Sequence, residues 1–544
     1  MGTHAAEPTY TSGFIRLTRP QFIGTIGGLM LCLLLAALDQ TIVGTAEPRI
    51  IASLSGFDRY PWVATAYLLS STICVPIFAK LSDIYGRKWF FLSGAVIFVT
   101  SSALCGAAGK MNWLPFDGMG QLIVFRGLQG VGAGIMFGLV FTIVGDVFSP
   151  AERGKYQGLF AAMWGAASIF GPTLGGWLTD NLSWRWCFYV NLPVGILSIT
   201  AIWIMFPYFH PQGVRRIIDW AGVGSLVACL VPLLLALTWV TQYGWSSPRV
   251  ESLLAGAAVM LAVFLFVETR APEPLIPLSL FRNPIILVCS IAGFIMGMGM
   301  FGVIMYLPLF MQGVLGVSAT RSGSLLTPMM LAAVTGNIFS GQMTSRLGRY
   351  KVLAITGAML IASGMIVFAN MDQFTKNSFV VLGMILCGVG LGFVQPVYTV
   401  AVQNAAPRQH MGTATASSQF FRSIGSTVGV AVFGSVLLTM YKHDFDAGVP
   451  QGTPAIALKP FSNPLMLPMI RPQLEAGFGR YAGGLQLLHR LFDNVKTSLV
   501  HGIHLIFVVG AVIMCVGVIL NFAIREIPLR GHARAEAPNS VEAL

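Results

Sequence analysis

Charged residues are scarce in this chain. Lys, Arg, Asp and Glu make up only 10% of its 544 residues, whereas 55% of the residues are hydrophobic. A soluble domain carries about 25% charged residues. The scarcity excludes an ordinary water-soluble fold, and repeated apolar stretches of about 20 residues indicate a helical protein that crosses the membrane many times.

Several sequence motifs of enzymes and pumps are missing. There is no Gly-x4-Gly-Lys-Ser/Thr loop to hold nucleotide phosphates, so transport driven by ATP is not expected. Neither His-Glu-x2-His nor paired Cys-x2-Cys occurs, and no nucleophile–base set is apparent. We therefore predict no enzymatic activity, no metal and no cofactor. All eight Cys lie in apolar segments, which indicates packing residues and no disulfide framework.

Positive charge exceeds negative charge, with a formal net charge of +12. In a soluble protein this excess would suggest a nucleic acid partner. Here the Lys and Arg residues lie in the short segments between apolar stretches, where they can contact lipid headgroups. Membrane lipids, and not nucleic acids, are the expected partners.

Fourteen apolar stretches predict fourteen membrane-spanning helices. They cover residues 21–46, 61–79, 89–108, 120–145, 156–178, 186–207, 219–240, 250–268, 285–311, 321–344, 351–370, 378–402, 413–440 and 498–522. An even number places both termini on one side of the membrane. Loops on that side hold most of the Lys and Arg, so the positive-inside rule predicts cytoplasmic termini and a multi-pass location in the inner (cytoplasmic) membrane.

A short polar turn occurs twice, at 79–88 after the second stretch and at 341–351 after the tenth. Its glycine permits a tight reversal, and its Arg and Lys hold it in the cytoplasm. Two copies indicate a transporter built from duplicated bundles. The predicted organisation is a cytoplasmic tail (1–20), a six-helix bundle (21–207), an inserted transmembrane hairpin (219–268), a second six-helix bundle (285–522) with an extracytoplasmic loop (441–497), and a cytoplasmic tail (523–544).

The late part of that loop, from Leu474 to Val500, has leucines and charges at loosely helical spacing. It predicts either an amphipathic helix on the membrane surface or a long helical lead-in to the last span.

Further motifs follow one another along the predicted helices. They are Leu38-Asp39-Gln40-Thr41-Ile42-Val43, the turn Asp83…Gly86-Arg87-Lys88, Arg126-Gly127-Leu128-Gln129-Gly130-Val131-Gly132, Gly165…Gly171-Pro172-Thr173-Leu174-Gly175-Gly176, Trp184-Arg185-Trp186-Cys187-Phe188-Tyr189-Val190-Asn191-Leu192-Pro193 and Phe421-Arg422-Ser423-Ile424-Gly425. In these residues the chain resembles the major facilitator superfamily, and within it the 14-span drug:proton antiporters. The resemblance covers nearly the whole chain.

The resemblance implies an all-α integral membrane protein with the 14-transmembrane-helix major facilitator fold, which has two pseudo-symmetric six-helix bundles and an inserted two-helix hairpin. It further implies export of hydrophobic or cationic drugs by alternating access, driven by the proton gradient. Two alternatives stay open: export of a lipid or an endogenous metabolite, and a non-transporting membrane sensor or scaffold. The chain departs from the usual motifs at Ala79, where Gly is usual, and at Glu47, where an apolar residue is usual.

Asp39 is the first candidate for proton coupling. It lies roughly 27 Å into the first predicted helix at ~1.5 Å per residue. A carboxylate at this depth costs several kcal/mol unless it is paired or protonated. A proton and a cationic substrate could therefore compete for it. The structural alternative is a packing residue satisfied by neighbouring hydroxyls such as Thr41.

Arg126 and Glu47 are the other coupling candidates. Arg126 lies at a similar depth and needs an acceptor, either Asp39 or a water-lined cavity. The alternative for Arg126 is snorkelling toward the outer headgroups. Glu47, two turns beyond Asp39, is either a second acidic site or an interfacial residue in water.

The polar turn predicts a cytoplasmic gate, formed by Asp83, Gly86, Arg87, Lys88 and Asp146. The resemblance implies that Arg87 pairs with Asp146 when the transporter faces outward. The alternative is that the positive charges serve membrane topology alone. In the second copy Ser345 replaces the Asp, so a matching latch there is expected to be weaker.

The fifth predicted helix holds the residues that resemble an export motif: Gly165, Gly171, Pro172, Gly175 and Gly176. The glycines allow close helix packing and Pro172 favours a kink. The resemblance implies a seal biased toward export, whereas ordinary small-residue packing explains the glycines equally well.

The expected substrate pocket lies between the halves and is lined by Met, aromatic and amide side chains. These suit varied lipophilic or cationic ligands. The candidates are Tyr67, Phe137, Phe141, Trp164, Met296, Met300, Tyr306, Asn337, Gln395 and Tyr398.

Overall fold

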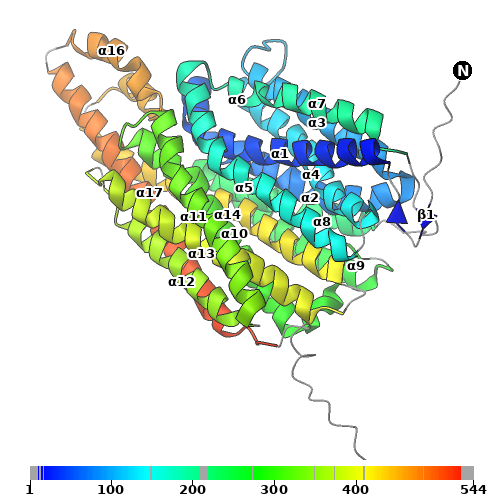
Figure 1. The fold of residues 1–544 in the computed structure, drawn as a ribbon. Helices are drawn as coiled ribbons and strands as arrows, with labels where there is room; N and C mark the ends of the chain where they lie inside the picture. Colours follow the sequence, from blue (N-terminus) through cyan, green and yellow to red (C-terminus); the bar gives the residue numbers. More distant parts are fainter. Residues whose placement is uncertain are drawn as a thin grey trace, which may run out of the picture. The chain divides into compact units, whose positions relative to one another are not determined.

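The computed structural model describes residues 10–11, 14–15, 18–147, 150–208, 219–272, 274–347, 349–372, 374–407, 411–451, 453–481 and 483–527. Within these ranges the fold is helical, apart from two paired two-residue strands, β1 (Tyr10–Thr11) and β2 (Phe14–Ile15). Eleven helices of the described chain are long and apolar enough to cross a membrane (Figure 1). The predicted all-helical membrane fold is confirmed at this level.

The helices of the first half follow the predicted spans closely. They are α1 (Arg19–Leu54), α2 (Trp62–Tyr85), α3 (Arg87–Ala107), α4 (Gly118–Val147), α5 (Pro150–Asn181), the short α6 (Trp186–Tyr189) and α7 (Asn191–Met205), followed by α8 (Trp220–Tyr243) and α9 (Pro248–Arg270). A 3-10 turn, η1 (Phe57–Arg59), joins α1 to α2.

The second half contains helices of similar length. They are α10 (Pro284–Gly313), α11 (Ala319–Leu347), α12 (Lys351–Ala369), α13 (Asn377–Ala405), α14 (Met411–Gly448) and α17 (Gly484–Phe522). α15 (Ala455–Leu458) and α16 (Leu467–Phe478) are short helices between α14 and α17.

The chain forms two compact units. Unit 1 comprises Met1–Leu275, Met311–Thr327 and Phe445–Val495, and unit 2 comprises Ile276–Phe310, Pro328–Asp444 and Lys496–Leu544. In unit 1, α4 packs against α2 and α3, and α1 packs against α5 and α7. In unit 2, α12 packs against α13. Small residues permit these close approaches: a Cβ added at Gly132 of α4 would lie 2.5 Å from the backbone nitrogen of Phe98 in α3.

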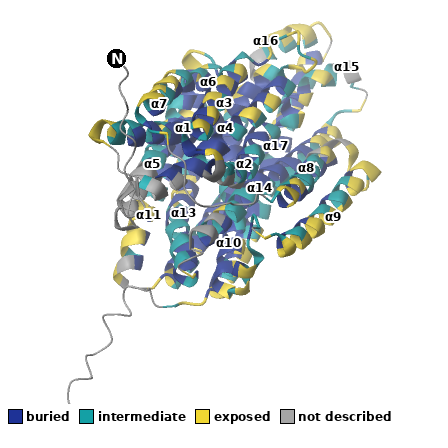
Figure 2. Ribbon diagram, turned by 90° about the vertical axis from the view of Figure 1, so that its right-hand side faces the viewer, coloured by how far each residue is buried: buried dark blue, intermediate teal, exposed yellow. Residues whose placement is uncertain are grey.

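The predicted hairpin 219–268 corresponds to α8 and α9. Its two helices hold a small buried cluster of Ala236, Val240 and Val250. Most side chains of α9 are exposed (Figure 2), and only 17% of its most apolar window is buried. Such a helix presents its apolar surface to lipid.

The segment 441–497 is largely helical. α14 continues to Gly448, and α17 begins at Gly484 and runs to Phe522 without a break. Leu488, Leu491 and Val495 are buried within the first turns of α17, whereas Leu485 is exposed. The helical lead-in, one of the two predicted alternatives, therefore describes this helix, while α16 is a separate short helix.

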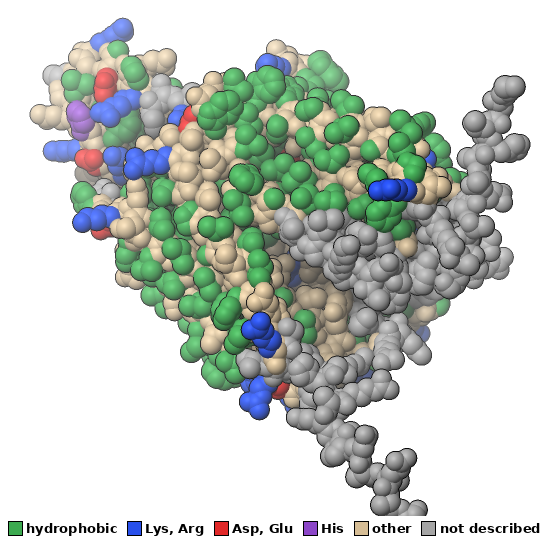
Figure 3. Space-filling view, in the orientation of Figure 1, with side chains coloured by type: hydrophobic (Ala, Val, Ile, Leu, Met, Phe, Trp, Pro, Cys, Tyr) green, Lys and Arg blue, Asp and Glu red, His purple; other side chains and the backbone are tan. Residues whose placement is uncertain are grey.

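Hydrophobic side chains cover much of the visible surface, and Lys and Arg gather at a few places on this face (Figure 3). Ile196, Trp203, Val259 and Ile519 are each more than half exposed. In water these side chains would be costly to expose, whereas hydrocarbon is their natural surrounding. The surface is therefore that of a multi-pass membrane protein.

Candidate functional site

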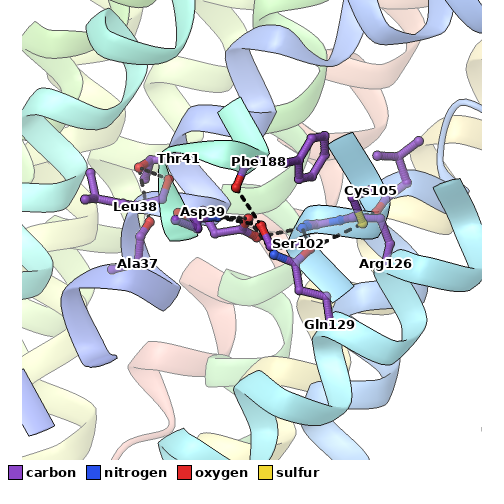
Figure 4. A network of polar contacts seen from close by, with 11 residues as sticks. Ala37, Leu38, Asp39, Thr41, Ser102, Cys105, Arg126, Gln129 and Phe188 are labelled. Carbon is purple, nitrogen blue, oxygen red and sulfur yellow. Dashed lines mark hydrogen bonds and ion pairs between the residues drawn. The ribbon is translucent and has the colours of Figure 1, made fainter. Parts of the chain in front are cut away.

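Asp39 lies in the middle of α1 with none of its surface exposed. Arg126 of α4 is also buried, and its Nη1 donates a hydrogen bond to Oδ2 of Asp39 at 2.6 Å (Figure 4). Asp39, one of two acceptors predicted for Arg126, is thus its acceptor in the structure. The close packing of α1 and α4 in unit 1 positions the pair.

Two amides complete the surroundings of the Asp39 carboxylate. Nε2 of Gln129 and Nδ2 of Asn191 each donate to Oδ1 of Asp39 at 2.9 Å. Oε1 of Gln129 in turn accepts from Arg126 Nη1 at 2.8 Å. Both carboxylate oxygens therefore have donors, and the negative charge is compensated in a site without water access.

The sequence did not predict Gln129 and Asn191 as site residues, although both lie in the motifs that carry the family resemblance. Gln129 follows Arg126 by three residues, so the two share one face of α4. That spacing was an available signal. No comparable signal exists for Asn191, because it reaches Asp39 only through the packing of α7 against α1.

The guanidinium of Arg126 has further partners. Its Nε donates to the carbonyl of Val63 at 3.2 Å, and its Cζ lies 4.3 Å from the ring centroid of Tyr67 on α2. A cation over an aromatic face is stabilised by the ring's quadrupole. α2, α4 and α1 together therefore hold one buried positive charge.

A second layer of hydrogen bonds fixes the amides. Nδ2 of Asn191 also donates to Oγ of Ser102 on α3, and Ser102 donates to the carbonyl of Phe188 at 2.9 Å. Sγ of Cys105 donates to Oε1 of Gln129 at 3.6 Å. Figure 4 shows these groups converging on Asp39 from several helices. Each member of the network is therefore held by at least one other member.

Neither structural alternative for these residues describes the structure. The Thr41 hydroxyl donates to the carbonyls of Ala37, Leu38 and Ala167 and is no partner of Asp39. Arg126 is 2% exposed, which excludes snorkelling in this conformation.

Glu47 lies two turns beyond Asp39 on α1, directly before Pro48. It is 1% exposed, so the interpretation as an interfacial residue in water is wrong. Its Oε2 atom is buried and has no hydrogen-bond partner. Arg126 is the charged group that acts on it electrostatically.

The polar turn after α2 reverses at Gly86, whose φ of 98° is a conformation that favours glycine. Arg87 is buried and donates to Oγ of Ser82 at 3.0 Å, and Nζ of Lys88 donates to the carbonyl of Trp203 at 2.8 Å. The side chains of Asp83 and Asp146 lie outside the described residues. The structure therefore places three of the five predicted gate residues.

The glycines of α5 face two helices. A Cβ at Gly171 would lie 2.0 Å from Oγ1 of Thr41, and one at Gly175 would lie 2.5 Å from the carbonyl of Ile42, both on α1. A Cβ at Gly176 would lie 2.2 Å from the carbonyl of Ala319 at the start of α11. Gly165 is buried as well.

Pro172 faces the same part of α11. A Cβ added at Gly323 would lie 2.0 Å from the Pro172 carbonyl. At the end of α5, Asp180 accepts hydrogen bonds from the backbone of Ala319 and from the backbone and hydroxyl of Thr320, at 2.6 to 3.3 Å. The first turns of α11 thus pack closely on α5 within unit 1.

The pocket candidates of unit 1 have mixed surroundings. Tyr67 is buried under Arg126. Phe137 and Trp164 are half-buried, and their ring centroids are 5.7 Å apart. The side chain of Phe141 lies outside the described residues.

In unit 2, two tyrosines use their hydroxyls inside the bundle. Tyr306 donates to the carbonyl of Val430 at 2.7 Å, and Tyr398 donates to Oδ1 of Asn521 at 3.0 Å. The other candidates range from buried to exposed: Met296 is buried, Met300 and Gln395 are half-buried, and Asn337 is exposed.

The chemistry available at this site is charge compensation and proton exchange. Within the described ranges no three His, Cys, Asp or Glu side chains are placed to hold a metal ion. What the residues around α1 offer is two buried acids and one buried cation.

Comparison with known proteins gives consistent matches. The sequence pattern of the Major Facilitator Superfamily matches residues 29–430. The chain is 38% identical over 522 residues to "Multidrug transporter protein MdtP" of Bacillus subtilis (strain 168), covering 93% of each chain. It is 37% identical over 417 residues to "Multidrug resistance protein 3" of the same organism, covering 76% of this chain and 80% of that protein.

Solved structures resemble this fold over nearly its whole length. A bacterial homologue of the human lysosomal transporter Spinster, in an inward-facing and unoccupied conformation, has a TM-score of 0.63 at 15% identity and covers 94% of this chain and 100% of that one. The D-xylose–proton symporter has a TM-score of 0.57 at 14% identity, with coverages of 91% and 97%. At these identities the likeness is one of fold.

Proposed function

We propose that this chain, which belongs to the major facilitator superfamily, exports hydrophobic or cationic drugs in exchange for protons by alternating access. The multidrug transporters among its relatives indicate small-molecule substrates and a transport protein, not an enzyme. We place it in the cytoplasmic membrane with fourteen crossings and both termini in the cytoplasm. The proton gradient is the driving force in this proposal.

The buried network around Asp39 and Arg126 carries the proposal. Removing two charges from water costs several kcal/mol per ion, and apolar residues of similar volume are often as stable or more stable. An ion pair inside a membrane bundle is therefore a functional feature by default. A sensor or scaffold that moves nothing through the membrane has no need of it.

Competition between a proton and a cation explains the exchange. An ionised acid of α1, either Asp39 or Glu47, attracts a cationic substrate, whereas the protonated acid does not. Substrate affinity should therefore rise with pH. Because the proton and the substrate use the same acid, loading one requires release of the other, which couples the two flows.

The polar turn supplies the cytoplasmic gate in this proposal. Gly86 and Lys88 hold the turn, and Arg87 pairs with Asp146 near Asp83 when the cytoplasmic side is closed. The glycines and Pro172 of α5 form the seal that favours export. Substrates contact the half-buried aromatic side chains of unit 1, Phe137 and Trp164.

Transport in proteoliposomes tests the proposal. The purified chain is reconstituted, a pH gradient is imposed, and uptake of ethidium, tetraphenylphosphonium and labelled phospholipids is followed. We expect uphill movement of the organic cations that stops when a protonophore collapses the gradient. Lipid movement without cation movement would favour lipid export, and no movement of any probe would favour the sensor alternative.

Asp39→Asn is the matching variant for this assay. It keeps the size of the side chain but removes the charge that pairs with Arg126. We expect loss of uphill export when wild type and variant are compared at equal amounts of membrane-inserted protein. A variant that still concentrates an organic cation would remove Asp39 from the coupling mechanism.

A further inference from the structure

The two acids of α1 differ in their partners. Asp39 has three donors on its two oxygens, from Arg126, Gln129 and Asn191. Glu47 is equally buried, but its Oε2 atom has no hydrogen-bond partner. The same helix therefore holds one acid that is fully compensated and one that is not.

This difference decides which acid exchanges a proton more easily. Protonation of Asp39 would leave Arg126 buried without its counter-charge, and breaking one partner of a buried pair costs about 3–5 kcal/mol. Protonation of the unpartnered Oε2 atom of Glu47 breaks no hydrogen bond and removes a poorly solvated charge. Proton uptake and release thus require less rearrangement at Glu47.

The backbone around Glu47 offers the protonated acid a partner. Pro48 lies inside α1 and has no N–H, so the carbonyl of Gly44 lacks the donor that a helix normally supplies four residues later. Gly44 precedes Glu47 by three residues and shares its face of the helix. Only the protonated form of Glu47 has a proton to offer to such an acceptor.

The groups that surround this stretch of α1 are few. Arg126 of α4 is the cation, and the other titratable side chains are Asp39, Tyr67 of α2, Cys105 of α3 and Cys187 of α6. α5 presents Gly171 and Gly175, which do not titrate.

Two amides lie near the same stretch and do not titrate either. α7 contributes Asn191, whose amide is bonded to Asp39. Gln312 donates to the carbonyl of Thr45, and its own Oε1 is buried without a partner.

We infer that Glu47 is the residue that exchanges the transported proton for a monovalent organic cation, while Asp39 is a positioning residue that holds Arg126. The exchange is balanced: the protonated acid and the cation become an ionised acid with bound cation and one free proton. This inference rests on the proposed proton-coupled export. It assigns the exchange to the acid that departs from the usual family motif.

Substrate-induced proton release from the purified full chain tests the assignment. The protein in detergent is weakly buffered with a pH-indicator dye, and tetraphenylphosphonium is added while its binding is measured in parallel. We expect the wild type to release one proton for each cation bound near neutral pH. Glu47→Gln should release none and bind more weakly, with an affinity that no longer depends on pH.

Glu268→Gln is the matched control, because Glu268 is another buried acid that lies on α9, away from α1. It should release protons like the wild type. If Glu47→Gln releases one proton per bound cation, the assignment is overturned although proton-coupled export stands. If the wild type binds the cation without any release, the proposed exchange itself fails.

Glu47→Asp keeps the assignment testable if Glu47→Gln does not fold. The Asp side chain still titrates, but it is one methylene shorter, so its carboxyl group lies further from the groups around Glu47. We expect release of one proton with a shifted pH midpoint. A midpoint identical to that of the wild type would contradict the role of Glu47.

Discussion

At the scale of single residues, the Asp39–Arg126 pair should behave as a unit in stability. Asp39→Asn or Arg126→Gln alone leaves one buried charge unpaired and should cost about 3–5 kcal/mol. The double variant removes both charges, so its loss should be smaller than the sum of the single losses. Thermal unfolding midpoints in detergent provide the comparison, and strictly additive losses would show that the pair is not coupled.

The contact between Arg59 and Asp117 gives a pH-dependent prediction outside the membrane spans. Both nitrogens of the Arg59 fork donate to the Asp117 carboxylate, one of them at 2.9 Å, and this hydrogen bonding holds the pKa of Asp117 below its ordinary value. A lowered pKa in the folded state means stabilisation that is present above the ordinary value of about 4 and lost as the pH falls through the lowered value.

Asp117→Asn should therefore lower the unfolding midpoint at neutral pH and leave it unchanged in strong acid. The side chains are partly exposed, so the effect corresponds to no more than about 1 kcal/mol. Asp58→Asn is the control, because its contact with Arg59 is longer, at 3.6 Å. A difference in unfolding midpoint between wild type and Asp117→Asn that grows toward acid pH would contradict this prediction.

The sequence predicted the charged members of the site better than its neutral ones. A lone acid and a lone cation at equal depth in two apolar helices must find partners, so Asp39 and Arg126 could be matched from their positions. Asn191 could not be found in this way. An amide at the end of a helix costs little free energy, so its presence does not indicate that it needs a partner. The burial of Glu47 also escaped prediction, since its depth depends on how α1 extends to Leu54.

At the scale of elements, the close contact between α5 and α1 predicts that Gly→Ala substitutions in these helices differ in their effect on stability. A Cβ at Gly175 would lie 2.5 Å from the Ile42 carbonyl, a backbone atom that cannot move aside easily. Gly175→Ala should therefore cost about 1–3 kcal/mol through overpacking and impair transport. The measurement is the unfolding midpoint together with the transport rate.

Gly27→Ala on α1 is the matched control. Apart from the adjoining backbone of α1, nothing lies within 4 Å of a Cβ added there, and Ala favours a helix over Gly by roughly 0.5–1 kcal/mol. It should be tolerated or stabilising. Equal effects of both substitutions would show that the packing of α5 on α1 is not the cause.

The segment after α17 forms hydrogen bonds with the second polar turn. Oε1 of Glu526 accepts from the backbone N–H of Tyr350 at 3.0 Å, just before α12, and the Tyr350 hydroxyl donates to the carbonyl of Arg525 at 3.1 Å. Glu526 thus supplies a carboxylate to the copy of the turn in which Ser345 replaces the acid.

Glu526→Ala should lower the unfolding midpoint by an amount that corresponds to about 1 kcal/mol, the usual value of a lost cap. Glu526→Gln keeps an acceptor oxygen and should retain most of the stability. Equal losses in the two variants would indicate that the charge matters and the hydrogen bond does not.

Helix positions were predictable because apolar length and polar turns determine them. The ends differ from the prediction by a few residues at most spans, and α17 differs more because its first turns are amphipathic and its apolar run begins later. Helix α1 continues beyond its predicted end since Pro48 is accommodated inside it.

At the scale of the whole molecule, the gate predicts a shift between conformations. Arg87→Gln or Asp146→Asn should favour inward-open states by removing the charge pair that we propose closes the cytoplasmic side. Coupling between states is worth on the order of 1–3 kcal/mol, so the population should shift about 5–150-fold. A cysteine placed on the cytoplasmic side should react faster with a thiol reagent in both variants, and unchanged reactivity would leave the turn a topology signal.

The sequence predicts fourteen membrane crossings, which is a more detailed statement than the structure supports. Eleven described helices meet the length and hydropathy of a span, while α2, α5 and α11 are long but fall outside that set. α11 carries polar residues such as Thr335, Asn337 and Gln342, which lower its hydropathy. These three side chains are exposed in the structure, so the low hydropathy of α11 reflects an exposed polar face and not a buried one.

The most direct test of proton-coupled export uses a gradient of the substrate to drive the movement of protons. Liposomes containing the purified chain and an internal pH dye are equilibrated at equal pH on both sides, and an organic cation such as tetraphenylphosphonium is added outside with the membrane potential clamped. Inward movement of the cation through an antiporter must drive protons out, so the interior should become alkaline, and Asp39→Asn should abolish the change. Entry of the labelled cation through the wild type with no change of internal pH would contradict the account.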